Sequence, residues 1–409
     1  MTFHIRSAGA RLVILALIMG MLGLNGCRSR EPGESTTGQT GTHSETTHPT
    51  NPVQTITPTQ ATLPPETTAP TEPQTEPIDP ALAMDALNEL LIGVPFFPGA
   101  QGLAADWSDS TLANAVYCKL LWDGYSQEQS TCLYLAGLKS HSGEEDFLLY
   151  FDLEWMDTIA RDAFGREFPR DTHSDLIVVS GNEVSVMPAI GESSTLMIQN
   201  LVQQGDTVLA VGISVHNDNA GSTFNGCFRA AFRINPDSLY GFTLVSIEPL
   251  AQALIQPVLT AEASSALVES HTTHGPWNVL DGDPGTTWCE DASGRGIGEW
   301  LRLETEDGSP VPLCAVSFAL GFQGTDALLR NNGWPTRILI ECEDGFRQEA
   351  EFYSYNDVVM LDRPVTTEWI KITILDARAG TLYEDTCISD ITLLGVDSQC
   401  VLDSDVAGN

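Results

Sequence analysis

The chain has 409 residues, with 55 acidic residues against 19 Lys and Arg, and its formal net charge at pH 7 is -36. Too few cations are present to neutralise the phosphates of a nucleic acid, so the composition argues against binding of nucleic acid and against electrostatic docking on anionic lipid. The apolar content of 42% is normal for a globular protein, and the length allows a tail and two domains. The acidity is typical of a soluble surface; a field that gathers Ca²⁺ or cationic ligands is the alternative.

The N-terminal residues resemble a bacterial lipoprotein signal peptide. Arg6 and Arg11 form a basic leader, and residues 12–24 are almost wholly apolar but too few for a comfortable membrane span. Cys27 follows a small residue directly after this run, as in the lipobox of lipoproteins. The resemblance implies that residues 1–26 are removed and that lipid on Cys27 anchors the protein to the extracellular face of the cell membrane. An ordinary secretory signal with an incidental cysteine is the alternative.

Residues 27–80 predict a disordered linker. Thr, Pro, Ser, Gln and Glu dominate this stretch, which therefore cannot bury enough apolar surface to offset its chain entropy. The composition favours polyproline II conformation, and at ~3 Å per residue the stretch reaches on the order of 150 Å when extended. Such a spacer holds the rest of the chain away from a membrane.

Residues 81–255 predict an α+β domain with an antiparallel sheet. Two stretches have helical periodicity and end at Gly93 and Gly165, and pairs of apolar runs separated by polar turns indicate hairpins. The predicted helices cover 82–93 and 152–165, the hairpins cover 176–186, 196–213 and 228–247, and further strands are predicted at 116–121, 132–138 and 147–151.

Residues 81–255 contain none of the catalytic motifs that a sequence reveals directly. There is no His-Glu-x-x-His, Gly-x-Ser-x-Gly, Cys-x-x-Cys or phosphate-binding glycine loop. Acidic residues are abundant, yet no pair has a spacing that indicates a glycosidase. We therefore expect no enzymatic activity; a polysaccharide-acting enzyme with its catalytic site in 81–255 is the alternative.

Residues 256–397 predict an all-β sandwich, followed by a tail at 398–409. Short apolar strands alternate with turns at regular spacing, and no long helix is indicated. The predicted strands are 300–303, 315–320, 337–342, 358–361, 369–375 and 387–395.

Five short motifs in this sandwich follow one another in a recognisable order. They are Asp-Gly-Asp at 281–283, Thr-Trp at 287–288, Gly-Ile-Gly-Glu-Trp at 296–300, Asn-Asn at 331–332 and the run from Tyr383 to Ile391. Together they resemble the NADase-type glycan-binding domain, a discoidin-like, galactose-binding-like jelly roll. The resemblance implies a β-sandwich that binds carbohydrate. It does not imply NAD glycohydrolase activity, because no matching catalytic part precedes it.

The loops of the sandwich offer the residue types that sugars need. Sugar sites combine aromatic faces with amides and carboxylates that reach hydroxyl groups. Gly333 and Trp334 stand where the family usually has a basic residue, so Trp334 offers a stacking surface, with core packing as the alternative. The candidate glycan contacts are Glu290, Gln323, Asn331, Asn332 and Trp334.

The acidic loop that contains the first motif is a candidate calcium site. Related jelly rolls hold a structural Ca²⁺ between this loop and the last strand, and by position the candidate ligands here are Asp281, Asp283, Thr286 and Asp390. Backbone carbonyls would complete the six to eight oxygens that Ca²⁺ takes. A plain Asx turn without an ion is the alternative. His274 lies just upstream and is interpreted as a loop residue or as a glycan contact.

The chain has nine cysteines, so eight are left besides Cys27, an even number that permits disulfides in an exported protein. Their pairing cannot be read from the sequence, and buried free thiols are the alternative. The sequence thus favours a surface lipoprotein that binds a glycan or a cell-wall or host polysaccharide. A polysaccharide-acting enzyme with the sandwich as targeting module, and an envelope protein that binds another protein, are the alternatives.

Overall fold

The computed structural model describes residues 77–94, 100–126, 138–139, 148–172, 177–187, 193–218, 220–251 and 254–401. The predicted signal segment, Cys27 and nearly all of the predicted linker lie outside these residues. We call residues 77–251 the α+β part and residues 254–401 the sandwich. None of the helices in the described ranges is long and apolar enough to cross a membrane.

In the described ranges the helical side of the α+β part is formed by α2 (Pro80–Leu91), α3 (Asp109–Ser126) and α5 (Leu153–Phe164). The side chain of Asp79 caps α2 by accepting a hydrogen bond from the Ala81 amide, and Asp152 caps α5 through the Glu154 amide. Gly165 ends α5 with a left-handed φ of 66°. The predicted helices at 82–93 and 152–165 are confirmed.

One sequence prediction in this part is wrong, because residues 116–121 form a turn of α3 rather than a strand. The run is short and largely apolar, a pattern that fits a buried strand as well as a segment of a buried helix. However, Leu112, Val116 and Leu120 recur every four residues and are all fully buried. This helical stripe packs into the core, so tertiary packing overrides the local propensity.

The strands of the α+β part form antiparallel hairpins. They are β1 (Gly102–Leu103), β2 (Leu138–Lys139), β3 (Leu149–Asp152), β4 (Ile177–Ser180), β5 (Glu183–Val186), β6 (Ser193–Gln204), β7 (Thr207–Asp218), β8 (Gly221–Ile234) and β9 (Phe242–Leu250). The β4–β5, β6–β7 and β8–β9 pairs confirm the three predicted hairpins. Apart from Leu138, the predicted strand 132–138 lies outside the described residues.

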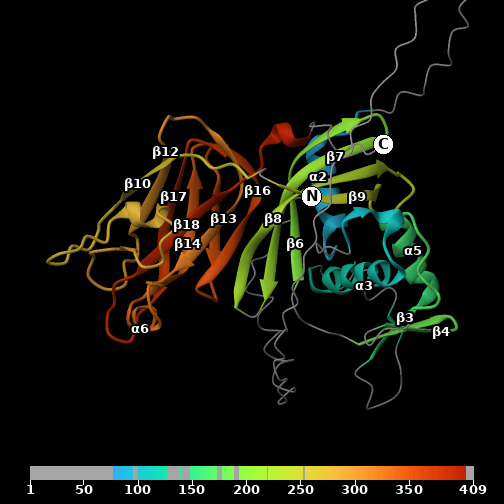
Figure 1. Ribbon diagram of the computed structural model, residues 1–409, viewed down its shortest axis with the longest axis horizontal. Helices are drawn as coiled ribbons and strands as arrows, with labels where there is room; N and C mark the ends of the chain where they lie inside the picture. Colours follow the sequence, from blue (N-terminus) through green and yellow to red (C-terminus); the bar gives the residue numbers. More distant parts are fainter. Residues whose placement is uncertain are drawn as a thin grey trace, which may run out of the picture. The chain divides into compact units, whose positions relative to one another are not determined.

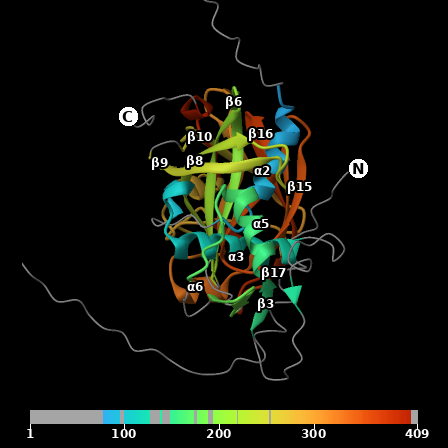
Figure 2. The ribbon, with the colours of Figure 1, turned by 90° about the vertical axis from the view of Figure 1, so that its right-hand side faces the viewer.

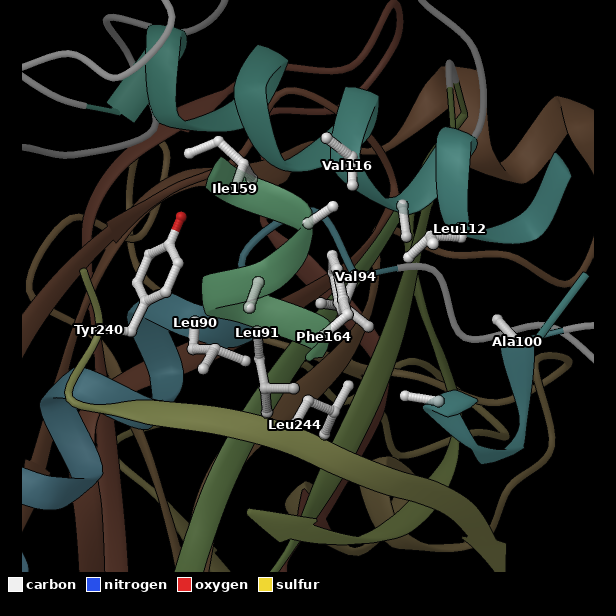
Figure 3. Close-up of a cluster of buried hydrophobic side chains, with 14 of the residues drawn as sticks. Leu90, Leu91, Val94, Ala100, Leu112, Val116, Ile159, Phe164, Tyr240 and Leu244 are labelled. Carbon is white, nitrogen blue, oxygen red and sulfur yellow. The ribbon is translucent and has the colours of Figure 1, made fainter. Parts of the chain in front are cut away.

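The core of the α+β part lies between the helices and the long hairpins. α2 packs on β6 and β9, α5 packs on β9, and α3 packs on α5. The three helices gather on the side that faces the viewer in Figure 2. Leu90, Leu91, Ile159, Phe164 and Leu244 come from three of these elements and converge in one buried cluster (Figure 3).

The sandwich consists of two sheets and one short helix. Its strands are β10 (Leu259–Ala263), β11 (Trp288–Cys289), β12 (Trp300–Thr305), β13 (Val311–Leu320), β14 (Trp334–Cys342), β15 (Arg347–Glu351), β16 (Asn356–Thr367), β17 (Trp369–Arg378) and β18 (Cys387–Leu394), and its helix is α6 (Asp326–Asn331). One sheet has the order β10-β12-β17-β14-β15, and β16-β13-β18-β11 form the other. The α6 helix lies at one end of the strands (Figure 1). The predicted fold class, an α+β part followed by a discoidin-like jelly roll, is confirmed.

The two parts share a sheet and an apolar cluster. A parallel bridge between Gly221 and Asn356 joins β8 to β16. Gln199 of β6 accepts a hydrogen bond from the Val396 amide at 2.6 Å and donates one to the Val396 carbonyl at 3.0 Å. Since Gln199 is buried, these two bonds satisfy both atoms of its amide group.

Candidate functional site

The acidic loop at 281–286 is folded by hydrogen bonds within itself. The Asp281 carboxylate accepts from the Asp283 amide at 2.9 Å and from the Thr286 hydroxyl at 2.8 Å. Asp283 accepts from the Gly285 amide at 2.8 Å. These are the bonds of Asx turns, and they bring three of the four candidate calcium ligands together.

Asp390 joins this loop from the last strand. Its carboxylate accepts a hydrogen bond from the Gly282 amide at 3.1 Å, across 108 positions of the chain. Burial raises the pKa of the Asp390 carboxyl, the nearby Asp281 carboxylate adds to the rise, and hydrogen bonds from Thr392 and Gly282 oppose it. The structure therefore brings all four candidate ligands to one place.

The fit of this loop to a metal ion depends on its oxygens. Within the described ranges, no three His, Cys, Asp or Glu side chains are grouped so that they could hold a metal ion. Each carboxylate nevertheless has about four acceptor positions, so the hydrogen bonds above leave acceptor capacity on Asp281 and Asp390. The donors are all hard oxygens, which is the chemistry that Ca²⁺ prefers.

Glu290, a candidate glycan contact, is fully buried. One carboxylate oxygen accepts from the Thr386 amide at 3.0 Å and the other from the Ala292 amide at 2.6 Å. Burial raises the pKa of the Glu290 carboxyl, while these two backbone hydrogen bonds lower it. In this position Glu290 joins two loops of the sandwich.

The three candidate amides also hold loops in place. The Gln323 side chain donates to the carbonyls of Leu320 and Tyr355, both at 3.2 Å. Asn332 is 9% exposed, and its amide donates to the Leu328 carbonyl at 2.9 Å. Asn331 accepts from the Thr381 hydroxyl at 2.9 Å. The structure brings Asn331 and Asn332 together at the end of α6, beside the loop 379–386.

Trp334 begins β14 and forms part of a pocket at the edge of the five-stranded sheet. Its ring is mostly buried against Tyr355, at a centroid distance of 5.1 Å. The pocket has a volume of about 390 Å³ and is lined by Trp334, Thr336, Arg337, Glu351, Phe352, Tyr353, Asp376 and Arg378. Trp334 therefore serves both the core and the pocket, which are the two roles that its sequence position left open.

Sequence reasoning missed the other residues of this pocket. Arg337, Glu351 and Arg378 read as ordinary polar positions of strands. They meet only because β14 pairs with β15 through Arg337 and Glu351, and with β17 through Trp334 and Arg378. The strand pairing is the signal that would have found them, and no local motif contains it.

A disulfide closes the end of the sandwich next to Glu290. Cys289 of β11 and Cys387 of β18 are opposed in the strand pair, with their Cα atoms 4.3 Å apart, and are joined by a disulfide across 98 positions of the chain. Cys118, Cys227, Cys314 and Cys342 form no disulfide. Burial raises the pKa of the Cys118, Cys227 and Cys342 thiols to about 11.

Comparison with protein-family models identifies the class of the sandwich. Residues 255–394 match the NAD glycohydrolase translocation F5/8 type C domain. This match agrees with the discoidin-like resemblance that the motifs of the segment predicted. A comparison with curated proteins found no match.

Solved structures of carbohydrate-binding modules are similar to this segment. One is the family 32 CBM of C. perfringens NanJ in complex with galactose, at 19% identity and a TM-score of 0.27, covering 34% of this chain and 93% of that chain. Another is CpGH89CBM32-5 from Clostridium perfringens in complex with GalNAc-beta-1,3-galactose, at 12% identity and a TM-score of 0.27, covering 34% and 95%. A third is CBM32-3 from a family 31 glycoside hydrolase of Clostridium perfringens, at 16% identity and a TM-score of 0.26, covering 34% and 90%.

Proposed function

We propose that the sandwich binds carbohydrate in the pocket beside Trp334. The observation that carries this proposal is the set of side chains around the pocket, which combines aromatic rings with two guanidinium groups and two carboxylates. Aromatic rings pack on the apolar face of a sugar ring, and guanidinium and carboxylate groups hydrogen-bond its hydroxyl groups. The rest of the chain then presents this module to glycans of a cell wall or a host.

Tyr353 and Arg378 are two exposed residues of this pocket. The Tyr353 side chain is 47% exposed, and its hydroxyl donates to Glu351 at 2.7 Å. This hydrogen bond, more than burial, raises the pKa of the Tyr353 phenol, so the ring stays neutral and keeps its hydroxyl proton at physiological pH. A neutral, hydrogen-bonded phenol is held in one orientation, which suits a stacking surface.

A glycan array with the full chain tests the proposal. We expect Tyr353→Ala and Arg378→Ala to weaken binding of the selected glycan at least tenfold, about 1.4 kcal/mol or more. Arg363→Ala is the matched control, because Arg363 is exposed and pairs with Asp344 at the β14–β15 turn, at the opposite end of that hairpin. Wild-type binding by both pocket variants would place the glycan elsewhere. Product release from a bound polysaccharide would assign an enzymatic role to residues 81–255.

We also propose that the chain is a lipoprotein anchored at the extracellular face of the cell membrane. The support is the basic leader, the apolar run and Cys27 at its end. Metabolic labelling of the producing cells with a fatty acid is expected to label the protein, whereas Cys27→Ala is expected to stay unlabelled and to be released. Equal labelling of both forms contradicts this proposal.

A structural Ca²⁺ in the acidic loop completes the proposed function. Asp281, Asp283, Thr286 and Asp390 would hold it, and the ion would offset the repulsion between the Asp281 and Asp390 carboxylates. At 100 times its dissociation constant a bound ion stabilises the fold by about 2.7 kcal/mol. We expect millimolar Ca²⁺, but not Mg²⁺, to raise the melting temperature by several degrees, and Asp281→Ala to abolish the rise. An equal melting temperature in Ca²⁺ and in chelator is the outcome against this site.

A further inference from the structure

The two carboxylates that line the pocket beside Trp334 have partners within the protein. Glu351 accepts a hydrogen bond from the Tyr353 hydroxyl at 2.7 Å. Asp376 forms an ion pair with Arg295, whose Nη1 atom lies 3.6 Å from the carboxylate. These partners offset part of the negative charge that the lining presents to a ligand.

The two guanidinium groups of the lining differ in this respect. Arg337 pairs with Glu349, with the nitrogen and oxygen atoms 3.4 Å apart. The Arg378 side chain is exposed and has no ion pair or hydrogen bond with any residue in the described ranges. A guanidinium group carries five N–H donors in a planar fork, so Arg378 keeps all five for a ligand or for water.

An arginine without an acidic partner is unusual in this chain, which has 55 acidic residues against 19 Lys and Arg. Most arginines in the described ranges pair with Asp or Glu, and they include Arg161, Arg166, Arg170, Arg295, Arg302, Arg337, Arg347 and Arg363. Arg378 has no such partner among the described residues, and neither has Arg330 at the end of α6. The Thr381 amide, three positions after Arg378, donates to the Arg330 carbonyl at 2.9 Å. Two unpaired guanidinium groups thus belong to segments that meet beside the pocket.

Strand pairing places Arg378 beside the aromatic side chains of the pocket. Arg378 is the partner of Trp334 in the register of β14 and β17. Trp334, Phe352 and Tyr353 supply the aromatic rings of the lining. A sugar ring that packs on these rings is therefore bound next to the Arg378 guanidinium group.

We infer that the pocket selects sugar acids and that Arg378 binds the carboxylate of the sugar through two parallel N–H···O bonds. The inference rests on the proposed glycan binding and names its substrate class. A carboxylate matches the planar fork of a guanidinium group, and such charge-assisted bonds are about twice as strong as neutral ones. A uronic acid and a sialic acid both supply this group. The net charge of -36 repels an anion, so a preference for the acid comes from the pocket and not from the whole chain.

Calorimetric titration of the full chain with two pairs of probes tests the inference. One pair is a trimer of galacturonic acid and its methyl ester, and the other is sialyllactose and lactose. We expect the acid of one pair to bind about tenfold more tightly than its neutral counterpart, a factor between those of exposed and of buried charged contacts. The pair that shows this preference identifies the source of the carboxylate.

Variants of Arg378 assign the preference to its guanidinium group. Arg378→Gln is expected to bind the acid and the neutral probe with equal affinity. Arg378→Lys is expected to keep part of the preference, because the charge remains while the planar fork is lost. Arg233→Gln is the matched control, since Arg233 is exposed on β8, has no acidic partner in the described ranges and carries the same charge. It is expected to keep the full preference.

Three outcomes overturn the inference. They are an unchanged preference in Arg378→Gln, an equal loss in Arg233→Gln and Arg378→Gln, and equal affinity of the wild type for the acid and the neutral probe in both pairs. Each of them leaves the proposed function intact as long as a glycan binds. Binding of no glycan, on the array or in the titration, overturns both.

Discussion

Glu290 shows how one buried carboxylate organises the end of the sandwich. One oxygen accepts the amide proton of Ala292 and the other that of Thr386, 96 positions along the chain from Glu290, which fixes the loop after β11 to the start of β18. Gly296 packs directly on it, since a Cβ atom at that glycine would lie 2.5 Å from the Glu290 Cγ atom. The side chain therefore stabilises the end of the sandwich at which the loop after β11 meets the start of β18.

Glu290→Gln is expected to destabilise the fold by about 1–3 kcal/mol, because an amide NH₂ would replace one acceptor and leave a buried backbone N–H group without a partner. Urea unfolding followed by tryptophan fluorescence measures the difference. Asp291→Asn is the matched control, since Asp291 is exposed and adjacent in sequence. Equal midpoints for the two variants would show that the hydrogen bonds of Glu290 contribute nothing.

At the scale of single residues, the sequence predicted which side chains gather at the loops but not which hydrogen bonds they form. Gln323, Asn331 and Asn332 lie on the loops expected for sugar contacts. Their amides, however, already bond to the chain itself, and such bonds depend on backbone positions that no motif shows. Their glycan contacts stay predictions. Arg378 was missed because strand pairing alone brings it to Trp334, and Tyr353 was missed because it lies in the loop between β15 and β16.

Among the elements, β11 is the shortest strand of the sandwich and the one most dependent on a covalent bond. It has two residues, Trp288 and Cys289, and pairs only with β18 among the described strands. So short a strand makes few ladder hydrogen bonds, and the disulfide to Cys387 supplements them.

Replacing both cysteines, Cys289→Ser with Cys387→Ser, is expected to lower the free energy of unfolding by about 4–5 kcal/mol, the chain-entropy value for a loop of about 100 residues. Urea unfolding of oxidised protein with and without the substitutions measures it. Cys118→Ala, which removes a thiol outside the sandwich, is expected to have a smaller effect. The same stability before and after reduction of the wild type would contradict the expectation.

The elements that the sequence predicted are those with a clear period and a marked end. α5 has an Asp cap, a buried stripe and a terminal glycine, and the β4–β5 hairpin has alternating burial around a short turn. The failure at 116–121 has the opposite cause: α3 is buried on most sides, so further buried residues beside the stripe of Leu112, Val116 and Leu120 obscure its helical period in the sequence. The disulfide could not be predicted either, since eight cysteines allow 105 complete pairings.

For the whole molecule, pH acts through carboxyls whose pKa is raised by burial. They are Glu290, Asp357, Asp385 and Asp390. Between the ordinary carboxyl pKa and the raised value, the folded state binds more protons than the unfolded state, so stability falls as pH rises through that interval. Asp307 and Asp344 have lowered pKa values and act in the opposite direction, but both are near the surface, where solvent screens their contribution.

We therefore expect the free energy of unfolding to be higher at pH 5 than at pH 7, with the difference reduced by salt because the net charge of -36 adds self-repulsion at neutral pH. Urea unfolding at both pH values, each at low and at high salt, measures it. Greater stability at pH 7 in low salt would mean that the raised carboxyls do not dominate.

The order of the two parts, the fold class and the net charge were predictable at this scale. The joining of β8 and β16 into one sheet was not predictable. It depends on a single bridge between Gly221 and Asn356, which are 135 positions apart in the chain (356 − 221). Neither residue has a local pattern that indicates an edge contact. Long-range pairing of this kind is set by the packing of both parts, and the local hydrophobic period of a segment gives no information about that packing.

The two hydrogen bonds between Gln199 and Val396 have a consequence for the order of folding. They link positions 197 residues apart, and Val396 follows the last strand of the sandwich. During synthesis, β6 is complete long before Val396 exists. The side-chain amide of Gln199 therefore forms these two hydrogen bonds only after almost the whole chain has been made. Contacts of such separation slow folding and lengthen the time in which an apolar face is open to aggregation. The last few residues of the sandwich thus decide when the first long hairpin becomes fully protected.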